Sequence, residues 1–136
     1  MTSAGTPVGE LQVAIYERLS DDATLGELIT GVFDEVPEDQ PHPYVVIGEA
    51  IETPRNAHGQ FGREVVETLH IWDRARGFSR CQAIANRLVA LLDHQSMELP
   101  GHTVVSVRHE FAQLLRDPDP ELRHMPIRFR VTTEQE

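Results

Sequence analysis

A run of alternating side chains that leads directly into a helical repeat constrains the fold of this chain most. From Glu64 to Asp73 the residues alternate between an apolar set and a mixed set, which predicts a strand. From Phe78 to Leu92 apolar residues recur at spacings of three and four, which predicts a helix with one apolar stripe. The apolar sets are Val65, Leu69 and Ile71 in the strand, and Phe78, Cys81, Ile84, Ala85, Leu88, Leu91 and Leu92 in the helix. Since each element needs cover for one face, we expect them to pack together.

The flanking segments predict two further helices and several further strands. Thr6 and Pro7 are typical of a helix start, as an N-cap followed by a residue with a preset φ angle. A short second helix is expected to end near Gly31. Strand patterns cover residues 44–49, 103–115 and 124–131, with a possible short edge strand over residues 32–36.

Two features of these strands stand out. The segment 52–62 is rich in turn residues and predicts a long hairpin loop, of the kind often used for contact. Pro126 cannot donate to a strand ladder, so we expect the last strand to be irregular or partly at an edge.

The element order is helix, strand, strand, helix, strand, strand. It predicts an α+β fold with a single four- to five-stranded, mainly antiparallel sheet and helices packed on one face. The favoured arrangement is a permuted ferredoxin-like fold, in which the last strand lies beside the central one. The 136 residues are expected to form one domain, 1–136, with an ordered core over about residues 7–133.

Several features bear on the compartment of the protein. No apolar run approaches the roughly 20 residues that span a bilayer. Residues 1–7 lack the basic and apolar regions of a signal peptide, so we expect the cytoplasm as the compartment of the protein. The single cysteine, Cys81, lies on the apolar stripe of the helix and is expected to be a buried, inert thiol.

The charge is distributed unevenly along the chain. Residues 1–54 hold eleven acidic residues and one basic residue, whereas residues 55–136 hold eleven of each, so the first part carries the whole net charge of −10. All basic residues are arginine. One interpretation is a high-GC genome, which favours arginine codons. The other is a polarised subunit, whose acidic part meets the arginine-bearing part of a neighbour in a head-to-tail contact.

No reactive constellation is apparent. The seven histidines show no helical i, i+4 pair and no Cys-x-x-Cys accompanies them, so no metal site is predicted. There is no Gly-x-Ser-x-Gly elbow and no glycine-rich phosphate loop. We therefore expect no catalytic residues, no cofactor and no enzymatic activity. The acidic balance argues against nucleic-acid binding, and Arg108, Arg128 and Arg130 form either a local basic patch or cross-strand pairs with Glu110.

Several short segments, taken in order, resemble a known family. They are Leu11-Gln-Val-Ala-Ile-Tyr-Glu-Arg-Leu19, Phe33-Asp-Glu-Val-Pro37, Pro43-Tyr-Val-Val-Ile-Gly-Glu49, Glu67-Thr-Leu-His-Ile-Trp-Asp-Arg74, Arg116-Asp-Pro-Asp119, Arg123-His124 and Ile127-Arg-Phe-Arg130. Over about residues 10–133 the chain is similar to the tail completion, or tail terminator, family of long-tailed siphovirus-type bacteriophages, prophages and gene transfer agents. The resemblance implies a structural virion protein that carries no catalytic residues.

The resemblance also implies partners. Family members cap the tail tube as a ring, typically of six subunits, end tail polymerisation and form the surface for head–tail joining. The implied partners are further copies of the chain, the major tail tube protein and the head–tail connector, with DNA passing through the ring without specific binding. The implied location is the head-proximal end of the tail in the virion, after assembly in the host cytoplasm, and no membrane is involved.

The segment 52–62 and the turn 116–121 are the leading candidates for contacts with these partners. The candidate contact residues are Asp34, Glu35, Arg55, Asn56, His58, Arg63, Arg74, Arg76, Arg116, Asp117 and Asp119. A small host α+β module that holds a ligand or peptide without catalysis is the alternative, and a degenerate hydrolase is a third hypothesis.

Overall fold

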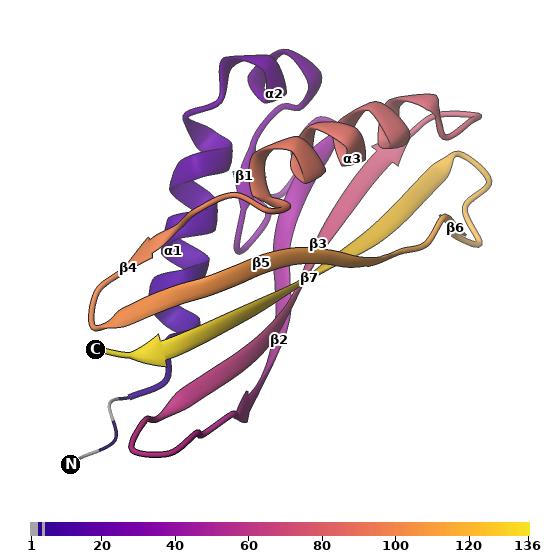
Figure 1. The fold of residues 1–136 in the computed structure, drawn as a ribbon. Coiled ribbons are helices and arrows are strands. Elements are labelled where there is room, and N and C mark those ends of the chain that lie inside the picture. The colour runs from indigo at the N-terminus through magenta and orange to yellow at the C-terminus, as the bar shows by residue number, and fades with distance from the viewer. Residues whose placement is uncertain (1–2, 4) are drawn as a thin grey trace.

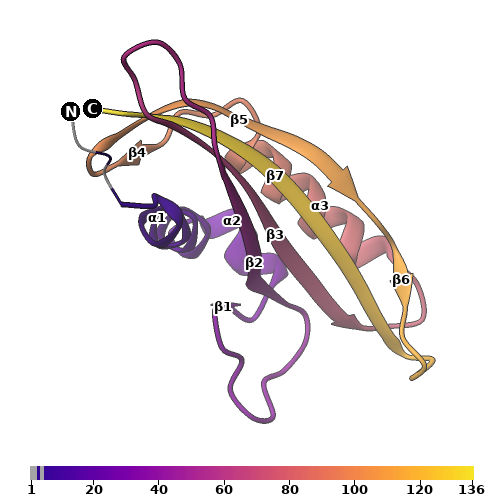
Figure 2. The ribbon, with the colours of Figure 1, turned by 90° about the horizontal axis from the view of Figure 1, so that it is seen from below.

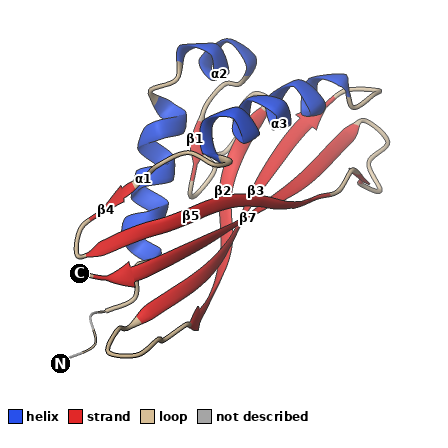
Figure 3. Cartoon of the chain, in the orientation of Figure 1, coloured by secondary structure: helices blue, strands red, loops and turns tan. Residues whose placement is uncertain are grey.

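The computed structural model describes residue 3 and residues 5–136, and in this part of the chain it contains three helices and one sheet (Figure 1; Figure 3). The helices are α1 (Val8–Ser20), α2 (Ala23–Leu28) and α3 (Ser79–Leu92). The strands are β1 (Val32–Phe33), β2 (Tyr44–Pro54), β3 (Gly62–Arg74), β4 (Glu98–Leu99), β5 (His102–Ala112), β6 (Leu115–Arg116) and β7 (Leu122–Gln135). Residues 1, 2 and 4, on which the expectation about a signal peptide partly rests, lie outside the described residues.

The helices lie where the apolar periodicity predicts them, and the residues at their starts differ slightly from the expected caps. Pro7 precedes α1, and the Thr6 hydroxyl accepts a hydrogen bond from the Val8 N–H at 3.2 Å. Asp22 caps α2, because its carboxylate accepts a hydrogen bond from the Leu25 N–H at 2.8 Å. The helix predicted from Phe78 onward is observed as α3.

The strands form a single sheet in the order β1-β2-β3-β7-β5-β4, with β6 paired to the end of β7. β1 runs parallel to β2, and the other pairs are antiparallel. All 13 residues of β3 pair with β7, from Gly62 opposite Glu134 to Arg74 opposite Leu122. The β3–β7 pair is therefore the central pair of the sheet.

The predicted fold class was wrong. The sheet is seven-stranded, mixed and curled into half a barrel with three helices, and it is not a four- to five-stranded mainly antiparallel sheet with helices packed on one face (Figure 2). β1, within the expected edge strand over residues 32–36, has two residues, as do β4 and β6, and the latter two were not expected because such short strands have no periodic pattern in the sequence. The curl is associated with register shifts within β2 and β5, since bulges bend a strand and increase its twist.

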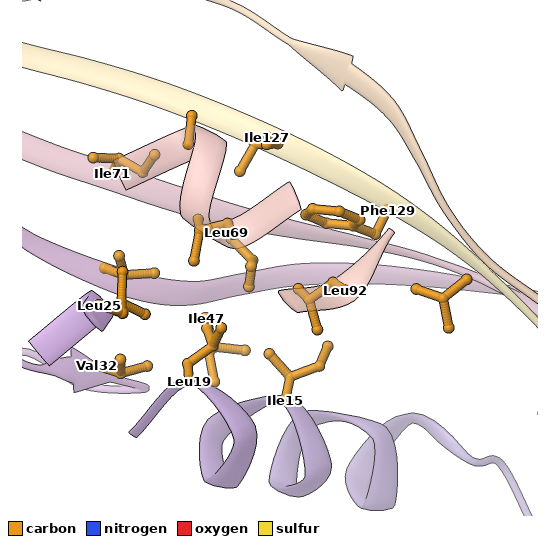
Figure 4. Close-up of a cluster of buried hydrophobic side chains, with 14 of the residues drawn as sticks. Ile15, Leu19, Leu25, Val32, Ile47, Leu69, Ile71, Leu92, Ile127 and Phe129 are labelled. Atoms are coloured by element: carbon orange, nitrogen blue, oxygen red, sulfur yellow. The ribbon is translucent and has the colours of Figure 1, made fainter. Parts of the chain in front are cut away.

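The hydrophobic core lies inside this curl, between the sheet and the helices (Figure 4). Ile15 and Leu19 of α1 point toward Ile47 of β2, while Leu69 and Phe129 come from the two central strands. Completely buried side chains of this size each contribute about 1.5–3 kcal/mol to folding. The core thus fixes α3 against β3 and β7, and α1 against β2.

Three local features of the strands depart from simple alternation or from the expected bounds. Val105 has the same parity as the buried Val107 but is exposed, because a register shift between Val104 and Ser106 turns Val104 toward the core instead. β7 is a central strand, but the expected irregularity is present at Pro126, because its missing N–H falls in the break between β5 and β6, where its carbonyl accepts a bond from the Gln113 N–H at 3.1 Å. The hairpin loop covers only residues 55–61, since β2 continues to Pro54.

Candidate interaction surfaces

The predicted contact residues lie in three separate places. Asp34 and Glu35 follow β1, four residues lie on the β2–β3 hairpin, and five lie at the opposite end of the sheet. The hairpin set is Arg55, Asn56, His58 and Arg63, and the opposite set is Arg74, Arg76, Arg116, Asp117 and Asp119. Because β3 joins the two sets with 13 residues, about 40 Å of strand separates them. One surface cannot include both sets.

The β2–β3 hairpin loop projects from one end of the sheet (Figure 2). Its backbone is held by hydrogen bonds from the Arg55 N–H to the Gly62 carbonyl at 2.8 Å and from the Gly62 N–H to the Asn56 side chain at 3.2 Å. A Cβ atom on Gly62 would lie 2.2 Å from the Arg55 carbonyl oxygen, so only glycine fits there. His58 at the tip is exposed, so the loop combines a backbone held by hydrogen bonds with an accessible tip.

The opposite end of the sheet is a compact cluster of arginines and aspartates. Arg74 donates to Asp119 at 2.9 Å, and the carboxylate of Asp119 also accepts from the Glu121 N–H at 3.0 Å. These two hydrogen bonds hold the pKa of Asp119 below its usual value, with the backbone bond the larger cause. Arg116 lies over the ring of Phe78 at 5.8 Å, so the cluster joins the β6–β7 turn to the start of α3.

The exposed side of α1 forms a third surface. Val13 and Tyr16 are 56% and 46% exposed, which is high for apolar and aromatic side chains of this size. A cleft of about 300 Å³ beside them is lined by Gln12, Asp34 and Ile47 among others. Asp34 therefore belongs with α1 in space, and it does not lie near the other predicted contact residues.

The outer face of the sheet carries a network of cross-strand ion pairs. Arg130 of β7 donates to Glu110 of β5 at 2.6 Å and to Glu64 of β3, and Arg55 lies 3.7 Å from Glu64. Of the two readings of the arginines in this region, cross-strand pairing is confirmed for Arg130. Arg128 and Arg108 differ, since neither has a carboxylate within 4 Å among the described residues, and Arg128 interacts with Glu49 only at longer range.

A chain of hydrogen-bonded rings on the same face was not predicted. The Nε2 atom of His70 lies 2.6 Å from Glu49 Oε1, its Nδ1 lies 2.7 Å from Nε2 of His124, and His124 stacks on Trp72 at 3.8 Å. Gly48 makes room for the His70 ring, because a Cβ atom there would lie 2.5 Å from it. The bond from His70 lowers the pKa of Glu49, and burial lowers that of His124. The sequence shows His70 and Trp72 on one face, but not the partner from β7.

Two buried carboxylates on the inner face of β3 were also missed. Glu67 is completely buried and accepts a hydrogen bond from the Gln12 amide of α1 at 3.2 Å. Burial raises the pKa of Glu67 to about 8. Asp73 is completely buried as well, and it accepts hydrogen bonds from Arg80 of α3, one at 2.9 Å. The sequence did contain a sign of both residues, because each is a charged residue at a position whose alternation places it on the inward face of a core strand.

The described residues contain no group of three or more metal-ligating side chains, and no described helix is long and apolar enough to cross a membrane. Cys81 is buried as predicted, and burial raises the pKa of its thiol to about 11, which keeps it protonated and unreactive. The exposed charged and apolar surfaces, held on a rigid curled sheet, are the features of a protein that works through contacts with other proteins.

Comparisons with known proteins identify this class more closely. The sequence profile of the tail completion protein gp17 family matches residues 13–134, so the chain belongs to this family. The chain is 32% identical over 124 residues to the tail completion protein gp17 of Bacillus phage SPP1, with 90% of each chain covered.

Solved structures agree with this assignment. A chain in the virion of a native gene transfer agent particle superposes with a TM-score of 0.88 at 25% identity, covering 96% of this chain and 99% of that one. The solved structure of bacteriophage SPP1 gp17 gives a TM-score of 0.65 at 29% identity, covering 95% and 96%. The protein is thus a structural tail protein that belongs to a tail assembly with other virion proteins.

Proposed function

We propose that the protein caps the tail tube as a ring, of six subunits as is typical of its family, and that this cap ends tube polymerisation and receives the head connector. The observation that carries the proposal is the match, over nearly the whole of both chains, to a protein within an assembled gene transfer agent virion. The location that follows is the head-proximal end of the tail, after assembly in the host cytoplasm.

The separation of the two predicted contact sets supports a subunit with two working ends. One end is the hairpin loop with Arg55, Asn56, His58 and Arg63, and the other is the cluster of Arg74, Arg76, Arg116, Asp117 and Asp119. A cap that stops one polymer and receives another structure needs two such surfaces, which face different partners. We assign one set to the tube and the other to the connector or the neighbouring subunit.

The charge supports passage of DNA without specific binding. The net charge is −10, and like charges repel the phosphate backbone over a range of about 8–10 Å at physiological salt. In this role the protein acts through shape and association, needs no cofactor and transforms no molecule.

The test is removal of the gene from a producing strain, followed by electron microscopy of the particles. The expected result is overlong tails that remain unjoined to heads, and restoration of both properties by the intact gene. Tails of normal length and joining in its absence would refute the proposal and favour a host binding module.

A second strain tests the hairpin. Replacing residues 56–61 by the two-residue turn Asn-Gly removes the loop and keeps Arg55 opposite Gly62, so the register of the β2–β3 ladder is unchanged. The purified variant should keep its helical and strand content by circular dichroism and lose capping. If tail length and head joining were unchanged, this loop would have no part in assembly.

A further inference from the structure

One side of α1 carries exposed apolar and acidic side chains that do not pack into the core of the subunit. Glu10, Val13 and Glu17 are spaced by three and four residues, so they line one side of the helix, and Tyr16 lies beside them. All four side chains are exposed. We call these four residues the acidic helix face.

Two clefts flank Val13 on this face. One, of about 570 Å³, is lined by Glu10, Glu17 and Glu98, and the other, of about 300 Å³, is lined by Tyr16 and Asp34 among others. Neither cleft is lined by a basic residue. The surface therefore has an apolar centre and an acidic rim, which consists of Glu10, Glu17, Glu98 and Asp34. This composition is typical of a contact site for a basic partner protein.

The carboxylates of this rim have no ion-pair partner in the part of the chain that the structure describes. The one arginine of α1, Arg18, donates instead to the carbonyls of Leu91 and Ser96, at 3.3 and 2.7 Å. It therefore holds the end of α3 and the loop that follows it. The rim charges are consequently not needed for intramolecular pairing and remain open to a partner molecule.

A complementary surface lies on the opposite side of the sheet. Arg108 of β5 and Arg128 of β7 have the opposite parity to the core residues Val107 and Ile127, so they lie on the outer, convex face. That face is turned away from α1 and α2 (Figure 2). Arg128 lies over the ring of Phe111, 4.5 Å from its centroid. We call Arg108, Phe111 and Arg128 the arginine strip.

The arginine strip matches the acidic helix face in chemistry. Each surface has an apolar or aromatic side chain beside charges. Neither exposed arginine has a carboxylate within 4 Å among the described residues, although Arg128 interacts electrostatically with Glu49 and the strip adjoins the ion pair of Arg130 with Glu110. Arginine tolerates partial burial at an interface and forms bidentate pairs with carboxylates. Since the two surfaces lie on opposite sides of one subunit, they cannot meet within it.

We propose that a second copy of this chain is the occupant, with the arginine strip of one subunit seated on the acidic helix face of the next. Such a head-to-tail contact uses two different surfaces and can repeat around a closed ring. The inference rests on the proposed capping function, and it adds which surfaces join the subunits of the cap.

Two variants with reversed charges test this contact. Glu10→Arg with Glu17→Arg makes both surfaces of a subunit basic, and Arg108→Glu with Arg128→Glu makes both acidic. The helix should tolerate the first pair, because the charge lost near its N-terminus is offset by one gained near its C-terminus. Thermal unfolding of each purified variant checks that it is folded.

Each variant alone should reduce the yield of joined particles of normal tail length by at least about tenfold in a strain that lacks the wild-type gene, because like charges then face each other. Production of both variants together should restore that yield. Each surface then meets an opposite charge in an alternating ring, which closes with an even number of subunits such as six. Restoration by the mixture is specific to a contact between copies.

Asp21→Arg with Glu27→Arg is the matched control for the Glu10 and Glu17 variant, since it changes the net charge by the same amount at exposed carboxylates outside the acidic helix face, and it should leave tails normal. Normal tails with either test variant alone would overturn the proposal. A mixture of two folded variants that fails to restore tails would also overturn it, and would assign these surfaces to another virion protein. A different result, normal tails after removal of the gene, would refute the proposed capping function itself.

Discussion

Residues 1–54 and residues 55–136 use their charges in different ways. In the second part most arginines hold the fold together, through ion pairs such as Arg74 with Asp119, Arg80 with Asp73 and Arg130 with Glu110. In the first part only three of the eleven carboxylates, those of Asp22, Glu49 and Glu52, lie within 4 Å of a cationic nitrogen or a histidine nitrogen among the described residues.

The difference separates charges that stabilise the subunit from charges that remain open to contact. An unpaired surface carboxylate adds little to stability, and several of them repel one another. A buried or paired carboxylate affects stability strongly, in a direction that depends on its partner. We therefore expect changes in the two parts to affect stability very differently.

Arg80→Met should give the largest loss of stability. It leaves the completely buried Asp73 carboxylate without its guanidinium partner, and we expect a loss of about 2–4 kcal/mol in the free energy of unfolding by urea denaturation. The double variant Asp73→Asn with Arg80→Met removes both charges and should recover at least half of this loss. A double variant as unstable as the single one would show that the packing of the arginine stem, not the ion pair, matters.

Glu67→Gln should stabilise the protein at high pH. Burial raises the pKa of Glu67 from 4.5 to about 8, so the folded state retains a proton that the unfolded chain releases above about pH 4.5. The contribution of Glu67 to the free energy of unfolding of the wild type is therefore fully present below pH 4.5 and is lost as the pH rises through 8. The variant should be more stable at pH 9 by on the order of 3 kcal/mol, with no such gain at pH 4.

The measurement is the free energy of unfolding at several pH values between 4 and 9, for the wild type and the variant. Glu134→Gln on β7, an exposed carboxylate, is the control and should leave the pH dependence unchanged. Parallel curves for the wild type and Glu67→Gln would show that Glu67 is ionised in the folded state at neutral pH.

Asp22→Ala should have an intermediate effect, because Asp22 is a paired carboxylate within the acidic part. It caps α2 and accepts hydrogen bonds from Arg87 of α3 at 2.7 and 2.8 Å, which lower its pKa to about 2. The stabilisation is present above pH 3.8 and is lost as the pH falls through 2. We expect the melting temperature to fall by about 5 °C at pH 7. Asp22→Asn keeps a capping oxygen and should lose less, and equal losses would exclude a capping role.

The strong periodic elements of the fold were predictable from the sequence. The inward sets of β3 and α3, Val65 with Leu69 and Cys81 with Leu88, are buried as their spacing indicates. The size and curl of the sheet were not predictable. Two-residue strands are defined by their partners, and a bulge such as that at Val105 depends on contacts distant in sequence.

The candidate surfaces were predictable only in part. Turn composition and charge single out the two ends of the sheet, including Arg55 and Arg116, and their roles as contacts stay predictions. The exposed side of α1 was missed, because Val13 and Tyr16 look like ordinary helix residues in sequence. The pair of His70 with His124 depends on the β3–β7 register, which a single sequence does not contain.

The smallest expected effect concerns the unpaired carboxylates of the acidic part. Glu35→Gln with Glu38→Gln removes two exposed charges that contact no cation among the described residues, so the melting temperature at physiological salt should change by less than about 2 °C. At low ionic strength self-repulsion is screened less, and the variant should then melt above the wild type, with the difference shrinking as salt rises. Glu134→Gln with Glu136→Gln, which lowers the acidity of the neutral part equally, should show a smaller salt-dependent gain. Equal gains in both pairs would mean that net charge, and not its concentration in residues 1–54, sets the repulsion.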